Sequence, residues 1–348
     1  MTLNKKILSG ISVLLAILFA VILLSLPKSF SAFADSASIP EPDVTGITGS
    51  MKAPYKDMFY VGAYTDNSTN YTLHYRYYQP QDMSERKEKV PLIIFLHGRG
   101  ERGSDNDMQL DNAILRPFIE NENSKFYDAM VIAPQCPVKD YNNGWVELFS
   151  DDETANALAY ANYSVDAVEE SNECKAIMAL IEDTCQKQNV DRNRIYIIGL
   201  SQGAVATWYL LAKHPNVFAA AVPIAGVGDV SKAEIYANIP IYAFHGDADT
   251  TVKYATATPK MYEAINAVGK GKMHFVTFEG GPHAIWESAI VFKGTDNLPA
   301  LETWLFSQSK ATEKKGCGAS IDARIALVFV PVIAMGAAVA MKKKEENN

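Results

Sequence analysis

A series of short, continuously apolar segments most constrains the fold of this 348-residue chain. Each is the length of one strand and has no alternating polar positions, which is typical of strands buried on both faces of a parallel sheet. Helical patterns lie between them, and this alternation predicts an α/β fold with right-handed crossovers. The apolar segments are residues 91–98, 129–137, 194–200, 219–226, 239–246 and 272–280, and helices are expected at about 163–188, 202–214, 253–268 and 297–308.

Two earlier segments, residues 59–65 and 71–80, alternate polar and apolar positions and predict an antiparallel opening pair. We therefore expect one domain over residues 55–308, with a mostly parallel central sheet flanked by helices. The connection at residues 226–239 is too short to hold a large lid. Residues 35–54 form a lead-in to this domain.

The chain begins like a secreted protein. Lys5 and Lys6 precede an uncharged stretch at residues 7–26, and Ala32 and Ala34 are the small residues of an A-x-A cleavage site. This pattern predicts a secretory signal peptide at residues 1–34. The stretch exceeds the usual apolar length of roughly 7–15 residues, so an uncleaved N-terminal anchor is the alternative.

A second apolar run, residues 325–341, is followed by three lysines at residues 342–344. A helix of this length spans about 26 Å, close to the bilayer core of about 30 Å, and the lysines favour the cytoplasmic side. We predict a transmembrane or sorting segment at residues 321–348 that anchors the protein at the cell surface, with a buried core helix as the alternative. A polar linker at residues 309–320 precedes it, in which Cys317 resembles a processing or lipid attachment point.

Charge and motifs limit the partners of the chain. The formal net charge is −8, and it becomes −11 without residues 1–34, which hold three lysines and no acidic residue. An acidic chain without basic clusters is a poor candidate for nucleic-acid binding. The sequence has no nucleotide-binding motif and no paired histidine spacing, and residues 105–112 resemble a calcium loop without its glycine. We expect no cofactor and no metal, and nothing in the sequence indicates an oligomeric state.

Four cysteines do not form a disulfide framework in a chain of this length. Cys174 and Cys185 fall on one apolar helix face, roughly 16 Å apart along the axis. This exceeds the Cα separation of roughly 7 Å that a disulfide allows. We therefore expect both to pack in the core, and Cys136 has no assigned role.

The sequence GLSQG, residues 199–203, follows a predicted strand and opens a predicted helix. A sharp strand-to-helix turn needs glycine two positions on either side of the serine, because no side chain fits there. Such a turn exposes the Ser201 hydroxyl at the helix N-terminus, where developing negative charge is stabilised. The pattern indicates a nucleophile, although a serine that caps the helix fits the same position.

A serine nucleophile needs a base, and the base needs a carboxylate that orients it. In this arrangement both follow the serine in the chain, on loops after later strands. Asp247 and Asp249 follow the strand at residues 239–246, and His283 follows the strand at residues 272–280. Either aspartate fits the order serine, aspartate, histidine.

Five separated motifs over residues 55–308 are similar to those of the α/β-hydrolase superfamily. The similarity is to its bacterial esterases and predicted peptidases, which are related to dienelactone hydrolases and polyhydroxybutyrate depolymerases. The motifs are HGRGERG (97–103), VIAPQCP (131–137), GLSQGA (199–204), HGDADTTV (245–252) and GGPHAIW (280–286).

The resemblance implies a catalytic triad with Ser201 as nucleophile and His283 as general base. Asp249 is the implied orienting acid, because it occupies the aspartate position of the motif HGxxDxxV. The backbone N–H groups of Arg99 and Gln202 are the implied oxyanion hole.

Several further residues have expected supporting roles. His97 and His245 each precede a glycine at a strand end and are expected to shape their loops. Trp145 and Trp286 are predicted to bind substrate, and Glu101 and Arg102 are expected to brace the oxyanion loop as an ion pair.

The predicted protein is a secreted, surface-anchored serine hydrolase that cleaves a small-molecule or polymer-borne carboxylic ester through an acyl-enzyme. A serine peptidase with the same triad is an alternative. A non-catalytic surface binding module is a further alternative, although such a module would be expected to lack a triad member.

Overall fold

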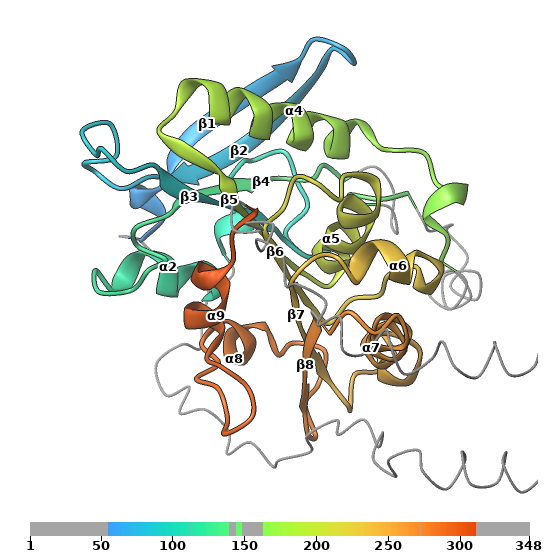
Figure 1. The fold of residues 1–348 in the computed structure, drawn as a ribbon. Helices are drawn as coiled ribbons and strands as arrows, with labels where there is room; N and C mark the ends of the chain where they lie inside the picture. Colours follow the sequence, from blue (N-terminus) through green and yellow to red (C-terminus); the bar gives the residue numbers. More distant parts are fainter. Residues whose placement is uncertain (1–54, 112, 139–143, 148–162, 272, 311–348) are drawn as a thin grey trace, which may run out of the picture. The chain divides into compact units, whose positions relative to one another are not determined.

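One eight-stranded sheet organises the chain, with the strand order β1-β2-β4-β3-β5-β6-β7-β8 (Figure 1). The computed structural model describes residues 55–111, 113–138, 144–147, 163–271 and 273–310. Strands β3 to β8 pair in parallel, whereas β2 is antiparallel to both β1 and β4. The expected α/β fold, mostly parallel sheet and antiparallel opening pair are therefore confirmed.

The strands lie close to the apolar segments of the sequence. Strand β5 is the exception, because it begins four residues before the predicted position. The strands are β1 (Tyr60–Asp66), β2 (Tyr71–Tyr78), β3 (Val90–Leu96), β4 (Met130–Pro134), β5 (Val190–Leu200), β6 (Ala220–Ile224), β7 (Ile241–Gly246) and β8 (Met273–Phe278).

The longer helices match the periodic segments, but their starts differ. Helix α4 begins at Asn172 rather than near residue 163, because the Ser171 hydroxyl accepts the N–H of Cys174 and caps the helix there. The described helices are α2 (Arg116–Glu120), α4 (Asn172–Lys187), α5 (Gln202–Lys213), α6 (Ala233–Tyr236), α7 (Thr258–Ala267), α8 (Trp286–Ile290) and α9 (Leu301–Ser307). Short 3₁₀ turns are η1 (Tyr55–Met58), η2 (Met108–Leu110), η3 (Ala113–Leu115), η4 (Val165–Ala167), η5 (Val230–Lys232) and η6 (Tyr254–Thr256).

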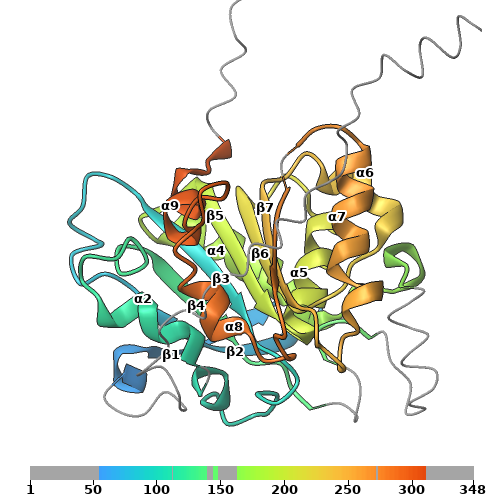
Figure 2. The ribbon, with the colours of Figure 1, turned by 90° about the horizontal axis from the view of Figure 1, so that it is seen from below.

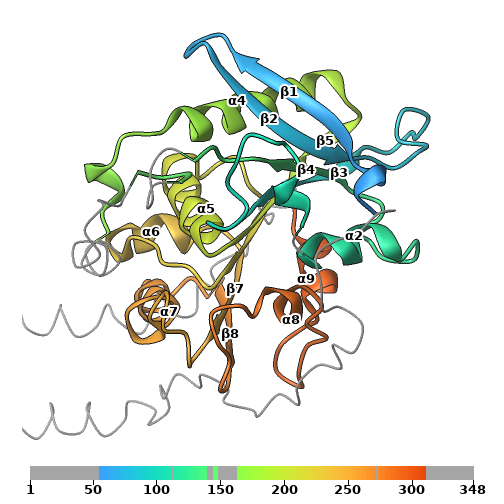
Figure 3. The same cartoon turned by 180° about the vertical axis from the view of Figure 1, so that it is seen from behind.

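Helices cover both faces of the sheet, so its central strands are buried on both sides. Helices α5, α6 and α7 lie on one face, and α2, α8 and α9 lie on the other (Figure 2). Helix α4 runs across the β1–β2 hairpin (Figure 3). In β3, Leu92 and Ile94 join the core under α4 and α5, whereas Ile93 and Phe95 join the core on the opposite face. Two separate cores explain why this strand is apolar at every position.

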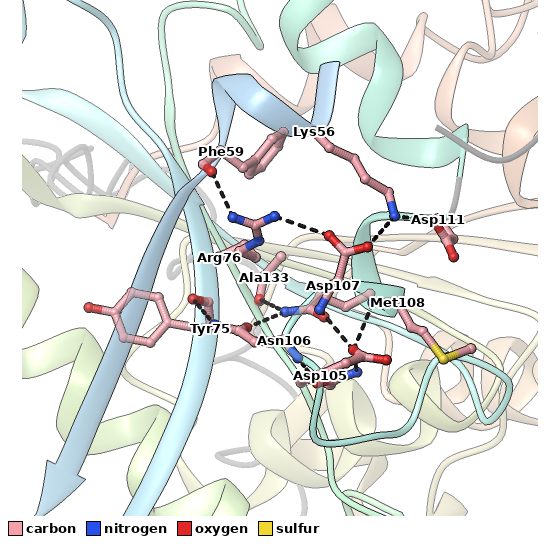
Figure 4. Close-up of polar contacts among 12 residues, drawn as sticks. Lys56, Phe59, Tyr75, Arg76, Asp105, Asn106, Asp107, Met108, Asp111 and Ala133 are labelled. Carbon is pink, nitrogen blue, oxygen red and sulfur yellow. Dashed lines mark hydrogen bonds and ion pairs between the residues drawn. The ribbon is translucent and has the colours of Figure 1, made fainter. Parts of the chain in front are cut away.

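The acidic segment at residues 105–111, which follows the loop after β3, is held by ion pairs (Figure 4). Asp107 contacts Lys56 at 2.6 Å and Arg76 at 3.1 Å, and Lys56 also pairs with Asp111. Lys56 and Arg76 hold the pKa of Asp107 below its ordinary value, against the opposing effect of burial. Two of the acidic side chains that resembled a calcium loop are therefore neutralised by cations of the chain itself, and the segment is tied to η1 and β2.

The cysteines that the structure describes, Cys136, Cys174 and Cys185, are buried. Cys174 and Cys185 lie on the buried side of α4 and pack in the core, as the sequence predicts. Cys136 follows β4, and its backbone N–H donates to His97 Nε2 at 2.9 Å. Cys317 lies outside the described residues.

Contacts divide the chain into residues 1–308 and residues 309–348. Among the described residues, no helix is long and apolar enough to cross a bilayer. The apolar runs at residues 7–26 and 325–341, on which the signal peptide and anchor predictions depend, lie outside those residues.

Candidate active site

The turn from β5 into α5 places Ser201 in an unusual backbone conformation. Its φ is 52° and its ψ is −118°, a region that residues with a side chain rarely adopt. Its backbone N–H donates to the carbonyl oxygen of Ile224 on β6 at 2.9 Å. The Ser201 side chain makes no capping hydrogen bond to α5, so its hydroxyl does not serve as the helix cap.

The two glycines around Ser201 permit close backbone contacts at this turn. A Cβ atom on Gly199 would lie 2.2 Å from the carbonyl oxygen of Gly203. One on Gly203 would lie 2.0 Å from the carbonyl oxygen of Leu96 on β3. Both positions therefore exclude any side chain, as the strand-to-helix turn requires.

Hydrogen bonds connect Ser201, His283 and Asp249. His283 Nε2 lies 2.9 Å from Ser201 Oγ, and His283 Nδ1 lies 2.7 Å from Asp249 Oδ2. Ser201 follows β5, Asp249 follows β7, and His283 follows β8, so all three lie where parallel strands end at one edge of the sheet. Ser201 is 8% exposed and the Asp249 side chain is fully buried.

These contacts define the protonation pattern of the His283 ring. A carboxylate oxygen accepts, so the proton of the neutral ring lies on Nδ1 and points to Asp249. The lone pair on Nε2 then faces the Ser201 hydroxyl, which donates to it. This is the tautomer in which His283 can accept a proton from Ser201.

Asp249 remains ionised although it is buried. Burial raises the pKa of its carboxyl, but hydrogen bonds from His245, His283 and the Val252 N–H outweigh burial and hold the pKa well below its ordinary value. Asp249 Oδ1 accepts the backbone N–H groups of Thr251 at 2.8 Å and Val252 at 2.9 Å. The negative charge needed beside His283 is therefore stabilised by its own loop.

Of the two aspartates that the sequence offers, only Asp249 contacts His283. Asp247 Oδ1 instead accepts the backbone N–H of Gly280 at 2.6 Å. It therefore joins the loop after β7 to the loop that carries His283. Gly246 allows the same approach, because a Cβ atom there would lie 2.2 Å from the Gly281 carbonyl oxygen.

The loop after β3 passes directly over Ser201. A Cβ atom on Gly98 would lie 3.5 Å from Ser201 Cβ and 2.7 Å from Leu200 Cδ1, so glycine permits this approach. Arg99 follows Gly98, and Gln202 opens α5 directly after Ser201. The two residues expected to form the oxyanion hole therefore flank the serine from two different elements.

His97 fixes the conformation of this loop. Its Nε2 accepts the Cys136 N–H at 2.9 Å, and its Nδ1–H donates to the Gly98 carbonyl oxygen at 2.6 Å. Burial lowers the pKa of His97 to about 4, so the ring is neutral near pH 7. In a trans peptide the Arg99 N–H points opposite to the Gly98 carbonyl, so this bond also sets the direction of that N–H.

The two tryptophans that were expected to bind substrate differ in their exposure and in their contacts. Trp286 is half-buried, and its ring lies edge-on to the His283 ring with centroids 5.7 Å apart. Trp145 is only 1% exposed, and its Nε1–H donates to the His97 carbonyl oxygen at 3.0 Å. Trp145 therefore holds the loop after β3 through His97 and has almost no exposed surface.

Arg102 and Gln135 brace the same loop through its backbone. Arg102 Nε donates to the Arg99 carbonyl oxygen at 3.1 Å, and Gln135 Nε2 donates to the Glu101 carbonyl oxygen at 3.2 Å. Glu101 Oε2 lies 3.9 Å from His97 Nδ1. No signal in the sequence indicates this role of Gln135, because in VIAPQCP it is one polar residue after a buried strand.

The described residues contain no group of three or more histidine, cysteine or acidic side chains placed to hold a metal ion. The chemistry available at this edge of the sheet is that of a serine hydroxyl beside an imidazole, with a buried carboxylate on the other side of the ring. Such a group of side chains can form and hydrolyse an acyl-serine.

The eight-stranded sheet with a serine at the β5–α5 turn places the chain in the α/β-hydrolase superfamily. Within it, the chain belongs to the phospholipase/carboxylesterase family, whose model matches residues 81–292.

Individual relatives agree with this assignment. The chain is 28% identical over 247 residues to poly(3-hydroxyalkanoate) depolymerase C of Paucimonas lemoignei, covering 62% of this chain and 53% of the depolymerase. It is 24% identical over 216 residues to acyl-protein thioesterase 1 of Debaryomyces hansenii, covering 59% of this chain and 88% of the thioesterase. The solved structure of a thermostable esterase matches with a TM-score of 0.60 and 31% identity, over 73% of this chain and 64% of the esterase. The chain thus spans about half of the depolymerase and less than two thirds of the esterase.

Proposed function

We propose that the protein hydrolyses carboxylic esters with Ser201 as nucleophile, His283 as general base and Asp249 as orienting acid. The observation that carries the proposal is the continuous hydrogen-bonded path from Ser201 Oγ through His283 to Asp249 Oδ2, with distances of 2.9 and 2.7 Å. Membership of the phospholipase/carboxylesterase family supports the same chemistry.

In the first half-reaction, Ser201 Oγ attacks the ester carbonyl carbon while its proton moves to His283 Nε2. The tetrahedral intermediate collapses, the bond to the alcohol oxygen breaks, and His283 gives the proton to the departing alcohol. In the second half, a water gives a proton to His283 and attacks the acyl-serine carbon. Collapse then releases the acid, and the same proton returns to Ser201 Oγ.

We assign the oxyanion hole to the backbone N–H groups of Arg99 and Gln202. One such donor is worth about 3–4 kcal/mol in the transition state, so the position of the loop after β3 matters as much as the triad. The close approach of Gly98 to Ser201 and the His97 bond to the Gly98 carbonyl support this assignment.

The substrate we propose is a small or polymer-borne ester at the cell surface. The signal-like residues 1–34 and the apolar run at residues 325–341, which three lysines follow, support secretion and anchoring. The relative from Paucimonas lemoignei is a depolymerase of poly(3-hydroxyalkanoate), which supports testing a polyester.

The test follows turnover of a short-chain aryl ester, the matching aryl amide and a 3-hydroxybutyrate oligomer by the full-length chain. Ser201→Ala is compared with Ser288→Ala, a serine of α8 outside the proposed triad. We expect ester turnover that only Ser201→Ala abolishes, with little amide turnover. Equal turnover by Ser201→Ala and the parent would refute the proposed nucleophile, and comparable amide turnover would assign a peptidase.

A further inference from the structure

Asp249 has a second histidine on its carboxylate. His245 lies near the end of β7 and is fully buried, and its Nε2 is 3.0 Å from Asp249 Oδ2 and 2.9 Å from the Val252 carbonyl oxygen. Both oxygens are acceptors, so Nε2 carries a proton and donates to them. Asp249 Oδ2 therefore receives two imidazole N–H groups, one from His245 and one from His283.

The other ring nitrogen of His245, Nδ1, also has a hydrogen-bonding partner. Its Nδ1 lies 2.8 Å from Thr258 Oγ1, which lies 3.2 Å from the Gly226 carbonyl oxygen. The hydroxyl has one proton, so it donates either to Nδ1 of a neutral ring or to Gly226 while accepting from a protonated ring. The Nε2–H bond to Asp249 is present in both states.

Titratable groups around His245 come from three segments. Asp249 is in direct contact, and His283 lies on the other side of the same carboxylate oxygen. The Tyr254 ring, on η6, lies edge-on to the His245 ring with centroids 5.7 Å apart. Tyr254 is tied to Thr277 on β8 by a 2.7 Å hydrogen bond between the two hydroxyls.

We propose that His245 is a positioning residue for the ester hydrolysis, acting through Asp249 on His283. The inference rests on the proposed function and adds to it a residue that touches neither substrate nor the reacting atoms. By donating to Oδ2, His245 fixes the oxygen that faces His283 and takes part of its negative charge.

This charge sharing limits how strongly Asp249 stabilises a protonated His283. A carboxylate with one fewer donor is a stronger base, and it favours the imidazolium form of the histidine beside it. With the second donor present, His283 keeps its lone pair available for the Ser201 proton at lower pH. Without the His245 N–H on Asp249, His283 should therefore stay protonated up to a higher pH.

Two substitutions separate donation from packing. Glutamine at position 245 carries an amide nitrogen near the place of Nε2 and can still donate to Asp249, whereas His245→Leu cannot. His274→Leu is the matched control, because His274 is a half-buried histidine on the neighbouring strand β8, opposite Tyr242 rather than Asp249.

The first measurement is the pH dependence of kcat and KM for the aryl ester with the full-length chain, between about pH 5 and pH 9. For His245→Leu we expect kcat to be lower by about tenfold or more, with a nearly unchanged KM. We also expect the fall of kcat at acidic pH to begin at a pH that is higher by about half a unit or more. His245→Gln should recover most of kcat and the original pH of this fall. His274→Leu should leave both unchanged.

The second measurement needs no turnover. The His283 ring is titrated by ¹⁵N NMR in the Ser201→Ala background, with and without His245→Leu, and its signal is assigned with His283→Gln. We expect the midpoint for His283 to rise when leucine replaces His245 and to stay in place with glutamine.

An unshifted His283 titration in folded His245→Leu, or equal effects of leucine and glutamine, would overturn the positioning role. If His245→Leu does not fold, His245→Asn, whose shorter amide falls short of Asp249, takes its place. Should Ser201→Ala hydrolyse the ester like the parent, the proposed function fails, while the NMR titration still decides the role of His245.

Discussion

His283 Nε2 lies 2.9 Å from Ser201 Oγ, although 82 positions separate the two residues in the chain. Two parallel strands, β6 and β7, lie between β5 and β8 in the sheet, and the loops after β5 and β8 meet above its edge. The contact depends on the strained Ser201 turn and on Asp249, which orients the ring.

The two aspartates after β7 should differ sharply in their effect on catalysis. Asp249→Asn presents an amide to His283 and favours the wrong ring tautomer, so we expect kcat to fall by about 10³- to 10⁴-fold. Asp247→Asn keeps an oxygen that can accept the Gly280 N–H, and we expect a change of only a few fold. The kcat values of both variants for an aryl ester check this, and similar losses in the two would contradict the assignment of Asp249.

Gly203, two positions after Ser201, should be essential for stability. Gly203→Ala would place a methyl group 2.0 Å from a backbone oxygen, so we expect a loss of about 3 kcal/mol or more in the free energy of unfolding. Gly100→Ala is the control, because a Cβ atom there has no neighbour within 4 Å, and we expect a change within about 0.5 kcal/mol. Urea unfolding measures both, and a Gly203→Ala variant as stable as the control would show that the turn relaxes.

His97 should make stability depend on pH in mildly acidic solution. Burial lowers its pKa from 6.5 to about 4 in the folded protein, so between these values the unfolded chain binds more protons and stability rises with pH. We expect the His97 contribution to fall by about 2 kcal/mol between pH 7 and pH 5.

His97→Gln should remove most of this pH dependence, whatever its effect on stability at pH 7. Because the pKa of the half-buried His274 is also lowered, the parent and the His97→Gln variant should share a smaller rise of stability with pH. Urea unfolding at the two pH values gives the comparison. If the free energy of unfolding of His97→Gln changes as much between pH 5 and pH 7 as that of the parent, another group causes the pH dependence.

The two tryptophans should affect different kinetic constants. Trp145→Phe removes the N–H donated to the His97 carbonyl, so we expect kcat to fall about 3- to 10-fold with little change in KM. Trp286→Ala removes a ring beside His283, and we expect a higher KM for bulky esters. Saturation kinetics with short and bulky aryl esters distinguish these effects. A raised KM in Trp145→Phe with an unchanged kcat would support direct contact of Trp145 with the substrate.

Features that depend on a few neighbouring residues could be predicted from the sequence. Continuous apolar segments located the parallel strands, and the spacing of Gly199, Ser201 and Gly203 predicted a turn that tolerates no side chains. The order of the parallel strands brings their carboxyl ends to one edge, so the loops bearing Asp249 and His283 were expected near Ser201.

Features that depend on tertiary packing could not be predicted in the same way. An aromatic residue in a long connection can face a pocket or a core, and only the contact with His97 shows which applies to Trp145. Helices α6 and α8 are too short to show a helical period. The contact of His245 with Asp249 depends on how the chain turns after β7, which no residue pattern specifies.

The central claim, that Ser201 is the nucleophile, is tested most directly by covalent labelling. The full-length chain is treated with a fluorophosphonate, residual ester hydrolysis is followed, and the modified peptide is identified by mass spectrometry. The account predicts one adduct, on Ser201, that forms in step with the loss of activity and is absent from Ser201→Ala. An adduct on another residue, or ester hydrolysis that persists with Ser201 fully labelled, would contradict it.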